Sequence, residues 1–380
     1  MDRDVSPPAL KRRRLGSDTV QTRREKESEI EEQPNPPSSM SEDLSIYSWN
    51  VNGIQPFTQR PITSFFKGRQ DPKVHHNDTA GAEGPAPTAS LRDFLRLRGW
   101  PTLLFLQEVK INPSDSATIR SVERSVRAPP GSAEPDYQAH FCLPSDKHNV
   151  RGFGGKVYGV CSIIRSDFLR SRVEQVRTVD WDAEGRFQIV ETKPCKGIPK
   201  LSIWNIYAVN GTTNPYRDPT TGAIKGTRHD RKLAVHALLL SDCKRLEEDG
   251  YRVILAGDLN IARARIDGFP NLRTFPEQHQ INRADFNAKF FDDPDGLRGI
   301  DTFRLLHRDK RGYTYYPRSR KFGESCDRVD LMICSRALKD NVKEANMLET
   351  PAFRGPSDHV PVYASFRFGE SHHGNDQNRT

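Results

Sequence analysis

The stretch Val253-Ile254-Leu255-Ala256-Gly257-Asp258-Leu259-Asn260 joins an apolar run to a turn that carries a carboxylate and an amide. A short apolar run that ends at a Gly-Asp turn is typical of a buried β-strand. Asp258 and Asn260 are therefore predicted to lie just past the end of that strand. Because Asp and Asn also suit turns for conformational reasons, the stretch indicates a site only if it has partners elsewhere in the chain.

Polar side chains follow several other predicted strands in the same way. Strand-like runs cover residues 44–50, 103–109, 157–164, 187–192, 201–207, 329–334 and 360–368. The polar residues at or beside their ends are Asn50, Asn52, Glu108, Asp330, Asp358 and His359. A carboxylate after a wholly apolar run, as at Glu108, is costly to bury unless it has a partner. A histidine with Asp330 on another strand to orient it is a common way to fix the tautomer of an imidazole.

Helical patterns lie between the predicted strands. The clearest one covers 232–248 and is closed by a glycine. Its predicted apolar face is formed by Leu233, Ala237, Leu240 and Leu246. A second helix is predicted over 283–291, and Ser90 is predicted to cap a short helix that runs to Trp100. Many strands with two or three interleaved helices indicate an α/β sandwich in which helices flank packed sheets.

The composition also predicts how the chain is divided. Residues 1–42 are rich in Pro, Ser, Glu and Arg, and we expect a disordered basic tail there. The folded domain is expected over 43–368, with surface insertions near 55–89 and 124–150, and a second disordered tail over 369–380. In the first tail, the run Lys11-Arg12-Arg13-Arg14 predicts a nuclear-import signal or a DNA-contacting arm; a cluster that only aids solubility is the alternative.

Charge and cysteine content limit the function classes. A formal net charge of +8 and a sequence pI of about 9.1 favour an anionic partner such as nucleic acid. The six cysteines include no C-x-x-C pair, so we expect reduced thiols and no zinc. No apolar run approaches the roughly 20 residues of a membrane helix, and no signal-peptide core is evident. We therefore expect a soluble intracellular monomer without a membrane partner.

Seven stretches in this chain resemble the exonuclease III / apurinic-apyrimidinic endonuclease family of the endonuclease/exonuclease/phosphatase superfamily. They are Trp49-Asn50-Val51-Asn52-Gly53-Ile54, Leu106-Gln107-Glu108-Val109-Lys110, Tyr207-Ala208-Val209-Asn210, Gly257-Asp258-Leu259-Asn260-Ile261-Ala262, Tyr313-Thr314-Tyr315-Tyr316, Asp327-Arg328-Val329-Asp330 and Gly355-Pro356-Ser357-Asp358-His359. They occur in family order across residues 44–368. The resemblance implies a four-layered α/β sandwich like that of deoxyribonuclease I, with two packed mixed β-sheets flanked by helices.

The resemblance also implies a metal and its ligands. Glu108 would bind an essential Mg²⁺, for which Mn²⁺ is a possible substitute, with Asn52 and Asp358 nearby. Asp258 and Asn260 would border the same metal. Hard oxygen ligands of this kind are those that Mg²⁺ prefers.

Further roles follow from the resemblance position by position. Asp258 would align or deprotonate the attacking water, while Asn260 and Asn210 hold the phosphate. Tyr207 would stabilise the transition state, and His359, oriented by Asp330, would contact the scissile phosphate. Asn50 would tie Glu108 to Asp258. The remaining residues expected to contact the substrate are Tyr315 and Arg228.

The activity implied is a Mg²⁺-dependent DNA phosphodiesterase of base excision repair. It would act on double-stranded DNA, cleaving 5′ to abasic sites or removing nucleotides and blocking groups from 3′ ends. The alternatives are a sibling phosphodiesterase that acts on tyrosyl-DNA adducts or poly(A), or a non-catalytic scaffold that binds DNA or the sliding clamp. Asn52 stands where some relatives have Asp. Asp327 stands where the family more often has an apolar residue lining the pocket for the abasic sugar.

A separate motif, Gln59-Arg60-Pro61-Ile62-Thr63-Ser64-Phe65-Phe66, fits the Q-x-x-I-x-x-F-F box that docks on the replication sliding clamp. Ile62, Phe65 and Phe66 would form an apolar plug on one 3₁₀ turn, with Gln59 hydrogen-bonded beside it. The alternative is that the two phenylalanines pin a loop onto the core.

Overall fold

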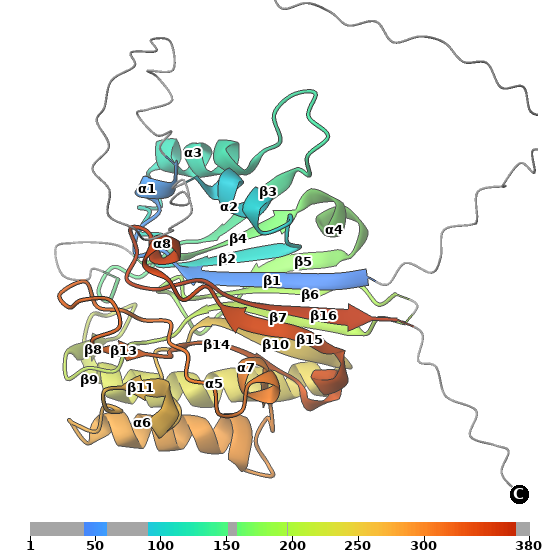
Figure 1. Cartoon of the computed structure of the whole chain (residues 1–380). Helices are drawn as coiled ribbons and strands as arrows, with labels where there is room; N and C mark the ends of the chain where they lie inside the picture. Colours follow the sequence, from blue (N-terminus) through green and yellow to red (C-terminus); the bar gives the residue numbers. More distant parts are fainter. Residues whose placement is uncertain (1–41, 59–89, 151–157, 196, 370–380) are drawn as a thin grey trace, which may run out of the picture. The chain divides into compact units, whose positions relative to one another are not determined.

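Two mixed β-sheets of six strands each form the centre of the fold in this computed structural model (Figure 1). The structure describes residues 42–58, 90–150, 158–195 and 197–369, which belong to one compact unit spanning Ser41–Thr380. In spatial order, the first sheet contains β15 (Val342–Met347), β16 (Val362–Phe368), β1 (Glu42–Asn50), β2 (Leu103–Gln107), β4 (Val160–Arg165) and β3 (Tyr137–Cys142). The second contains β12 (Ile300–Asp301), β14 (Asp330–Cys334), β10 (Tyr251–Asp258), β7 (Lys200–Tyr207), β6 (Phe187–Thr192) and β5 (Val173–Thr178).

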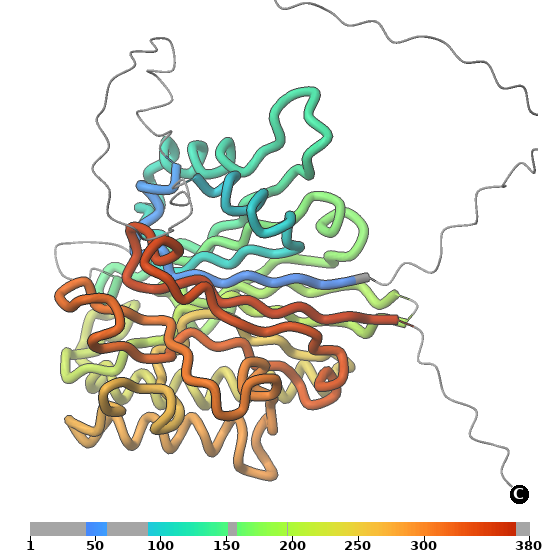
Figure 2. The backbone as a smooth tube through the Cα atoms, viewed as in Figure 1, coloured from blue at the N-terminus to red at the C-terminus, as the bar shows by residue number. Residues whose placement is uncertain are grey.

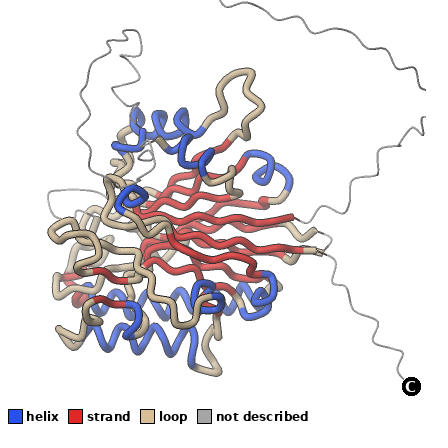
Figure 3. Tube along the Cα trace, viewed as in Figure 1, coloured by secondary structure: helices blue, strands red, loops and turns tan. Residues whose placement is uncertain are grey.

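Helices lie on both outer sides of the paired sheets, and two small strand pairs complete the fold (Figure 3). The helices are α1 (Gln55–Thr58), α2 (Leu91–Leu97), α3 (Ser116–Val126), α4 (Ser166–Ser171), α5 (Arg228–Glu248), α6 (Gln278–Asn287), α7 (Thr302–Leu306) and α8 (Pro351–Arg354). The small pairs are β8 (Pro215–Arg217) with β9 (Ile224–Thr227), and β11 (Gly268–Phe269) with β13 (Cys326–Asp327). Short 3₁₀ turns cover Arg265–Asp267 and Arg336–Asn341, and a π-helical turn, Ala288–Asp292, extends α6.

Three apolar layers hold the four structural layers together. Between the sheets, Ile46 and Phe105 of the first sheet belong to the same buried cluster as Ile254 of the second. Outside the first sheet, buried side chains of α1, α2 and α3 pack on β1, β2 and β4. Outside the second sheet, buried side chains of α5 and α6 pack on β7, β10 and β14. The predicted four-layered α/β sandwich is therefore confirmed.

The two ends of the folded unit are neighbouring strands. β1 and β16 pair antiparallel from Glu42↔Phe368 to Ser48↔Val362, so the blue and red ends of the tube run side by side in Figure 2. β1 ends at Asn50, and the segment that leads into β16 begins near Asp358. This pairing brings the first and last polar residues of the predicted site to the same edge of the sheet.

Gly257 allows the two central strands of the second sheet to approach closely. Its φ is +146°, and a Cβ atom at this position would lie 1.9 Å from the carbonyl oxygen of Ile206 on β7. Only glycine avoids that overlap. Because Asp258 follows directly, the close approach fixes where β10 delivers its last carboxylate.

The structure differs from the sequence predictions at several elements. The predicted loop 124–150 contains the end of α3 and all of β3, an edge strand with only its first and last residues buried. The predicted face of the long helix is only partly right: Leu246 is buried and Leu240 packs against the core, but Ala237 is exposed. The helix α5 also buries Val235, Leu239 and Cys243, which the prediction omitted. The predicted helix over 283–291 begins earlier, at Gln278. Ser90 does cap α2, where it accepts from the Asp93 N–H.

Some sequence predictions cannot be compared with the structure. The tail residues 1–41 and 370–380, with the basic run in the first, lie outside the described residues, as does the box 59–66. All six cysteines are free thiols, five of them buried. Among the described residues, no helix is both long and apolar enough to span a bilayer.

Candidate functional site

The predicted polar residues come together where strands of both sheets end. Asn50 is the last residue of β1, and Glu108 follows β2, its parallel neighbour. In the second sheet, Asp258 is in register with Tyr207 on one side and with Asp330 on the other. β14 runs antiparallel to β10, so its first residue lies beside the last residue of β10.

Asn50 joins the two sheets at this edge. Its side-chain Nδ2 donates to Glu108 Oε1 and to Asp258 Oδ2, each at 3.0 Å. Its Oδ1 accepts from the backbone N–H of Asn52 at 3.0 Å. The Ser357 hydroxyl donates to the Asn50 carbonyl at 2.6 Å, which ties in the loop before β16. Asn50 is fully buried, so its amide is held in one orientation between two carboxylates.

Glu108 and its neighbours place several oxygen atoms around the ammonium group of Lys110. The Lys110 ammonium lies 2.9 Å from Glu108 Oε2 and also donates to Asn52 Oδ1. Asn52 in turn donates from Nδ2 to Asp358 Oδ1 at 2.9 Å. Burial alone would raise the pKa of Glu108, but Lys110 and hydrogen bonds from Asn50 and Tyr207 hold it below its ordinary value.

The residues around Glu108 fit a divalent cation. The Lys110 ammonium already lies between the carboxylate of Glu108 and the amide oxygen of Asn52, and the carboxylate of Asp358 is next to that amide. These are hard oxygen donors, and one or two carboxylates with waters satisfy Mg²⁺. Glu108, Asp358 and Asn52 thus offer oxygen atoms that suit the predicted metal, and Asp258, Asp330 and His359 form a second group whose ligand atoms lie within 4.8 Å of one another.

Backbone strain is concentrated in the same place. Six non-glycine residues of the described chain have positive φ, and four of them are Asn52 (51°), Glu108 (49°), Lys110 (53°) and Asn260 (53°). Side chains other than Asn and Asp rarely adopt this conformation. Strained residues of this kind gather at functional sites, where the surrounding structure holds them.

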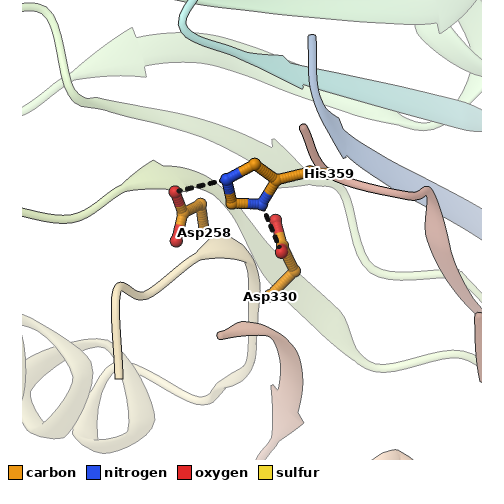
Figure 4. A group of neighbouring side chains, drawn as sticks. All are labelled: Asp258, Asp330 and His359. Carbon is orange, nitrogen blue, oxygen red and sulfur yellow. Dashed lines mark hydrogen bonds and ion pairs between the residues drawn. The ribbon is translucent and has the colours of Figure 1, made fainter. Parts of the chain in front are cut away.

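His359 lies between two buried aspartates (Figure 4). Its Nδ1 is 2.7 Å from Asp330 Oδ2, and its Nε2 is 3.9 Å from Asp258 Oδ2. Burial alone would lower the pKa of His359, but the two carboxylates outweigh it and raise the pKa to about 10. Burial and the Asp330 charge raise the pKa of Asp258 to about 7, against the opposing effect of His359. The group can thus hold and exchange a proton near neutral pH.

The ring of Tyr207 packs against the guanidinium of a buried arginine, Arg186. The Arg186 guanidinium lies 4.6 Å from the Tyr207 ring centroid and 4.7 Å from that of Tyr158. Burial and the Glu108 charge raise the pKa of Tyr207 well above its ordinary value, so its hydroxyl remains a donor. Arg186 is itself paired with Glu184 at 2.8 Å.

Arg228 belongs to this supporting network, not to the cleft. Its two terminal nitrogens donate to the two carboxylate oxygens of Glu184 at 2.9 and 2.8 Å. It does not line the cleft described below. The structure thus places Arg228 in an ion pair with Glu184, which supports Tyr207 through Arg186, and its predicted contact with the substrate stays a prediction.

Asn260 and Lys232 fix the loop that follows β10. Asn260 donates from its backbone to Asp258 Oδ1 at 2.8 Å and from Nδ2 to the Ala208 carbonyl at 2.9 Å. The buried Lys232 ammonium donates to the carbonyls of Val209, at 2.8 Å, and Asn260, at 3.0 Å. Burial lowers the pKa of Lys232 to about 7. Lys232 thus bridges the segments that follow β7 and β10.

A cleft of about 230 Å³ opens over these residues. One half of it is lined by Glu108, Tyr207, Asn210, Asp258, Asn260, Asp358 and His359. Tyr315 stands beside it, with its ring centroid 5.1 Å from that of His359. Asn50 and Asp330 lie beneath the cleft and hold the residues that line it. Of the predicted residues that the structure describes, Arg228 joins the supporting network and does not line the cleft, and the box 59–66 lies outside the described residues.

Sequence reasoning missed five lysines and arginines at the site. They are Lys110, Arg186, Lys232, Arg273 and Arg283. Lys110 was the easiest to find, because it closes the Leu106–Lys110 motif. Lys232 lies within a predicted helix, where a lysine normally faces solvent. No sequence signal marks it as buried.

Solved structures share this arrangement of layers. The catalytic domain of APE2 from Xenopus laevis aligns with a TM-score of 0.56 at 19% identity, over 86% of this chain and 94% of that one. The AP endonuclease LMAP from Leishmania major aligns with a TM-score of 0.60 at 16% identity, over 88% of this chain and 90% of that one. The 3′ phosphatase NExo from Neisseria, bound to a product DNA hairpin, aligns with a TM-score of 0.53 at 19% identity, over 85% of this chain and 99% of that one. The likeness defines the fold as a two-sheet α/β sandwich, with carboxylates gathered at the strand ends.

The sequence itself gives the family. A profile of the Endonuclease/Exonuclease/phosphatase family matches residues 47–359. The protein belongs to this family, and its chemistry is that of a nuclease or phosphatase acting on phosphate esters. Among curated proteins, none matches the sequence.

Proposed function

We propose that the protein is a Mg²⁺-dependent DNA repair nuclease that cleaves 5′ to abasic sites and trims 3′ ends. The observation that carries the proposal is the Asn50 bridge, which holds Glu108 and Asp258 together in a cleft that His359 also lines. Two further points support DNA as the substrate. The chain carries a net charge of +8, and its structural neighbours include AP endonucleases and a phosphatase bound to DNA.

Mg²⁺ would be held by Glu108 and Asp358 with the Asn52 amide oxygen. When bound, it would neutralise charge on the phosphate. Asp258 and Asn260 would border it from the second sheet.

The chain's own residues supply the remaining chemistry. Asp258 aligns a water and takes its proton, and a carboxylate with a pKa near 7 suits that task. The water oxygen bonds to phosphorus as the bond from phosphorus to the 3′ oxygen breaks. The products are a 3′-hydroxyl, once that oxygen takes a proton from solvent, and a 5′-phosphate.

Charge that develops on the phosphate is stabilised from three sides. Protonated His359, held by Asp330, donates from Nε2, and Tyr207 donates from its hydroxyl. Asn210 and Asn260 hold the non-bridging oxygens. Because Asp330 holds His359 and Arg186 packs against Tyr207 before the substrate binds, little reorganisation is needed during the reaction.

A substrate panel tests the proposal. The protein would be incubated with Mg²⁺ and an abasic-site duplex, a 3′-recessed duplex, a tyrosyl-adducted end or poly(A), with Asp258→Asn as the control. We expect cleavage of the first two and its loss in the variant. A preference for either of the last two would place the protein among the sibling phosphodiesterases. Binding of DNA without hydrolysis of any substrate would support the scaffold alternative.

Two sequence features outside the described residues extend the proposal. The run Lys11–Arg14 would direct the protein to the nucleus, and the box Gln59–Phe66 would dock it on the sliding clamp. Both locations suit an enzyme that processes DNA ends.

A further inference from the structure

The cleft continues beyond the reacting centre into a second, polar half. This half is lined by Arg273, His279, Asn282, Arg283 and Asp327, with Tyr315 at the boundary. A bare abasic sugar is small and offers few hydrogen-bonding groups. A pocket for it needs no carboxylate and no guanidinium groups, so these side chains require another explanation.

Asp327 is rigidly placed. Its carbonyl accepts from the backbone N–H groups of Thr314 and Tyr315 at 3.0 and 2.8 Å, and its own N–H donates to the Tyr315 carbonyl at 3.2 Å. Across β13 and β11 it pairs with Gly268. The carboxylate therefore projects from a backbone that is bonded on both sides.

Among the described residues, Arg273 and Arg283 line the same half of the cleft as the Asp327 carboxylate but form no ion pair with it. Burial raises the pKa of Asp327, while the charges of Arg273 and Arg283 act in the opposite direction. Within residues 42–58, 90–150, 158–195 and 197–369, no hydrogen bond or ion pair joins the Asp327 carboxylate to either guanidinium. All three side chains line the cleft.

The guanidinium of Arg283 is held in place by two backbone carbonyls. Its Nε donates to the Ala262 carbonyl at 2.7 Å, and its Nη2 donates to the Arg273 carbonyl at 2.6 Å. Asn282, which is almost fully buried, donates to His229 Nδ1 at 2.8 Å, and its Oδ1 is buried without a partner. The pocket thus presents acceptors and donors at fixed positions.

We propose that this half of the cleft binds the base of an unpaired 3′-terminal nucleotide, and that Asp327 selects a base with an exocyclic amine. The inference rests on the proposed function and names the substrate it favours. The amine of cytosine would donate to Asp327, while its ring nitrogen and carbonyl oxygen would accept from Arg273 or Arg283. Thymine presents a carbonyl oxygen where cytosine has the amine, and it would face the carboxylate with like partial charge.

An abasic sugar would leave the same carboxylate desolvated without a donor, which is unfavourable. The space also suits one extruded nucleotide, since the whole cleft measures about 230 Å³. After hydrolysis the terminal nucleotide leaves as a 5′-monophosphate, and the strand keeps a 3′-hydroxyl.

The test compares removal of a terminal dC with removal of a terminal dT. Each stands at the 3′ end of a duplex opposite dC, so that neither is paired. With wild-type protein and Mg²⁺, we expect kcat/KM for dC to exceed that for dT by about tenfold, the scale of one good base contact. Asp327→Asn, which keeps the size and can donate to thymine, should bring the ratio to one or below. Glu324→Gln, an exposed neighbour outside the cleft, should leave it unchanged.

A second measurement does not depend on any variant folding. A terminal pyrimidin-2-one nucleotide lacks only the amine of cytosine, and wild-type protein should remove it about tenfold more slowly than dC. Equal rates for dC, dT and pyrimidin-2-one, together with cleavage of an abasic duplex, would overturn this inference and leave the proposed function intact. Failure of wild-type protein to cleave any DNA would overturn both.

Discussion

The Nδ1 atom of His359 lies 2.7 Å from Oδ2 of Asp330, and the same imidazole turns Nε2 toward Asp258. A buried cation between two carboxylates links folding to pH. The pKa of His359 is raised to about 10, so folding favours its protonated form. This contribution is complete below the ordinary pKa of about 6.5 and is lost as pH rises toward 10. The raised pKa of Asp258 acts in the same direction: its contribution to the unfolding free energy is lost as the pH rises from about 4 to about 7.

The lowered pKa of Lys232 acts in the opposite direction above pH 7, so the effect of His359 is measured as a difference between two proteins. Between pH 6 and pH 9 we expect metal-free wild type to lose at least ~1 kcal/mol more of its unfolding free energy than metal-free Asp330→Asn. Urea unfolding in EDTA would measure it. Asp330→Asn removes the nearer carboxylate and should flatten this part of the pH profile. The same slope in wild type and variant would contradict the assignment.

Glu108→Gln should abolish metal-dependent cleavage. The amide keeps the hydrogen bond from Asn50 but removes the charge that would hold Mg²⁺. We expect activity on an abasic duplex to fall at least ~100-fold, and isothermal titration to show weaker Mg²⁺ binding. The matched control is Glu134→Gln, a carboxylate that pairs with Arg92 and Arg96 outside the cleft. Activity that survives in both Glu108→Gln and EDTA would exclude this ligand.

The strand ends of this site were predictable because each carries its own local signal. An apolar run followed by Asp258 or Glu108 is visible without knowledge of the fold, and the order of the motifs gave the sandwich. Strand pairing then brings these residues together, as the register of Asp258 with Tyr207 and Asp330 shows.

The supports of the site were not predictable in the same way. Lys232 and Arg186 are charged residues that the fold buries, and nothing in their neighbourhood distinguishes them from solvated ones. The resemblance implied a substrate contact for Arg228, whereas its partner in the structure is Glu184, 44 positions away in sequence. Such pairs become apparent only when the distances between side chains are known. The same holds for α5, whose buried face includes His236 and Cys243.

Arg228→Met should reduce stability more than it reduces catalysis. Glu184 is almost fully buried and would keep only Arg186 as a close cation, so we expect a loss of roughly 1–3 kcal/mol in unfolding free energy. At a temperature where the variant is folded, kcat/KM should fall less than tenfold, because the side chain is outside the cleft. Arg245→Met, which removes an exposed ion pair with Asp242, serves as the control. A large rise in KM with unchanged stability would restore Arg228 to the substrate.

Gly257→Ala should disrupt the second sheet next to the site. The added Cβ would overlap the Ile206 carbonyl, and we expect a loss of roughly 3 kcal/mol or more. Gly250→Ala separates this overlap from the effect of backbone conformation. Gly250 also has positive φ, at +84°, but nothing lies within 4 Å, so it should lose about 1–2 kcal/mol. Equal losses in the two thermal or urea unfolding curves would show that the close strand approach is not decisive.

The box Gln59–Phe66 predicts binding to the sliding clamp through its apolar residues. In such a docking peptide, Phe65 and Phe66 would enter a pocket on the clamp, whereas Arg60 and Thr63 occupy positions that the motif leaves free. Replacing both phenylalanines with alanine in the full chain should therefore weaken binding by roughly 30-fold or more, measured by isothermal titration with purified clamp. Arg60→Ala with Thr63→Ala is the matched control and should bind like wild type. Equal affinity for both double variants would mean that the motif does not dock. Cleavage of free abasic DNA should be the same in all three proteins, because no catalytic role is proposed for the box.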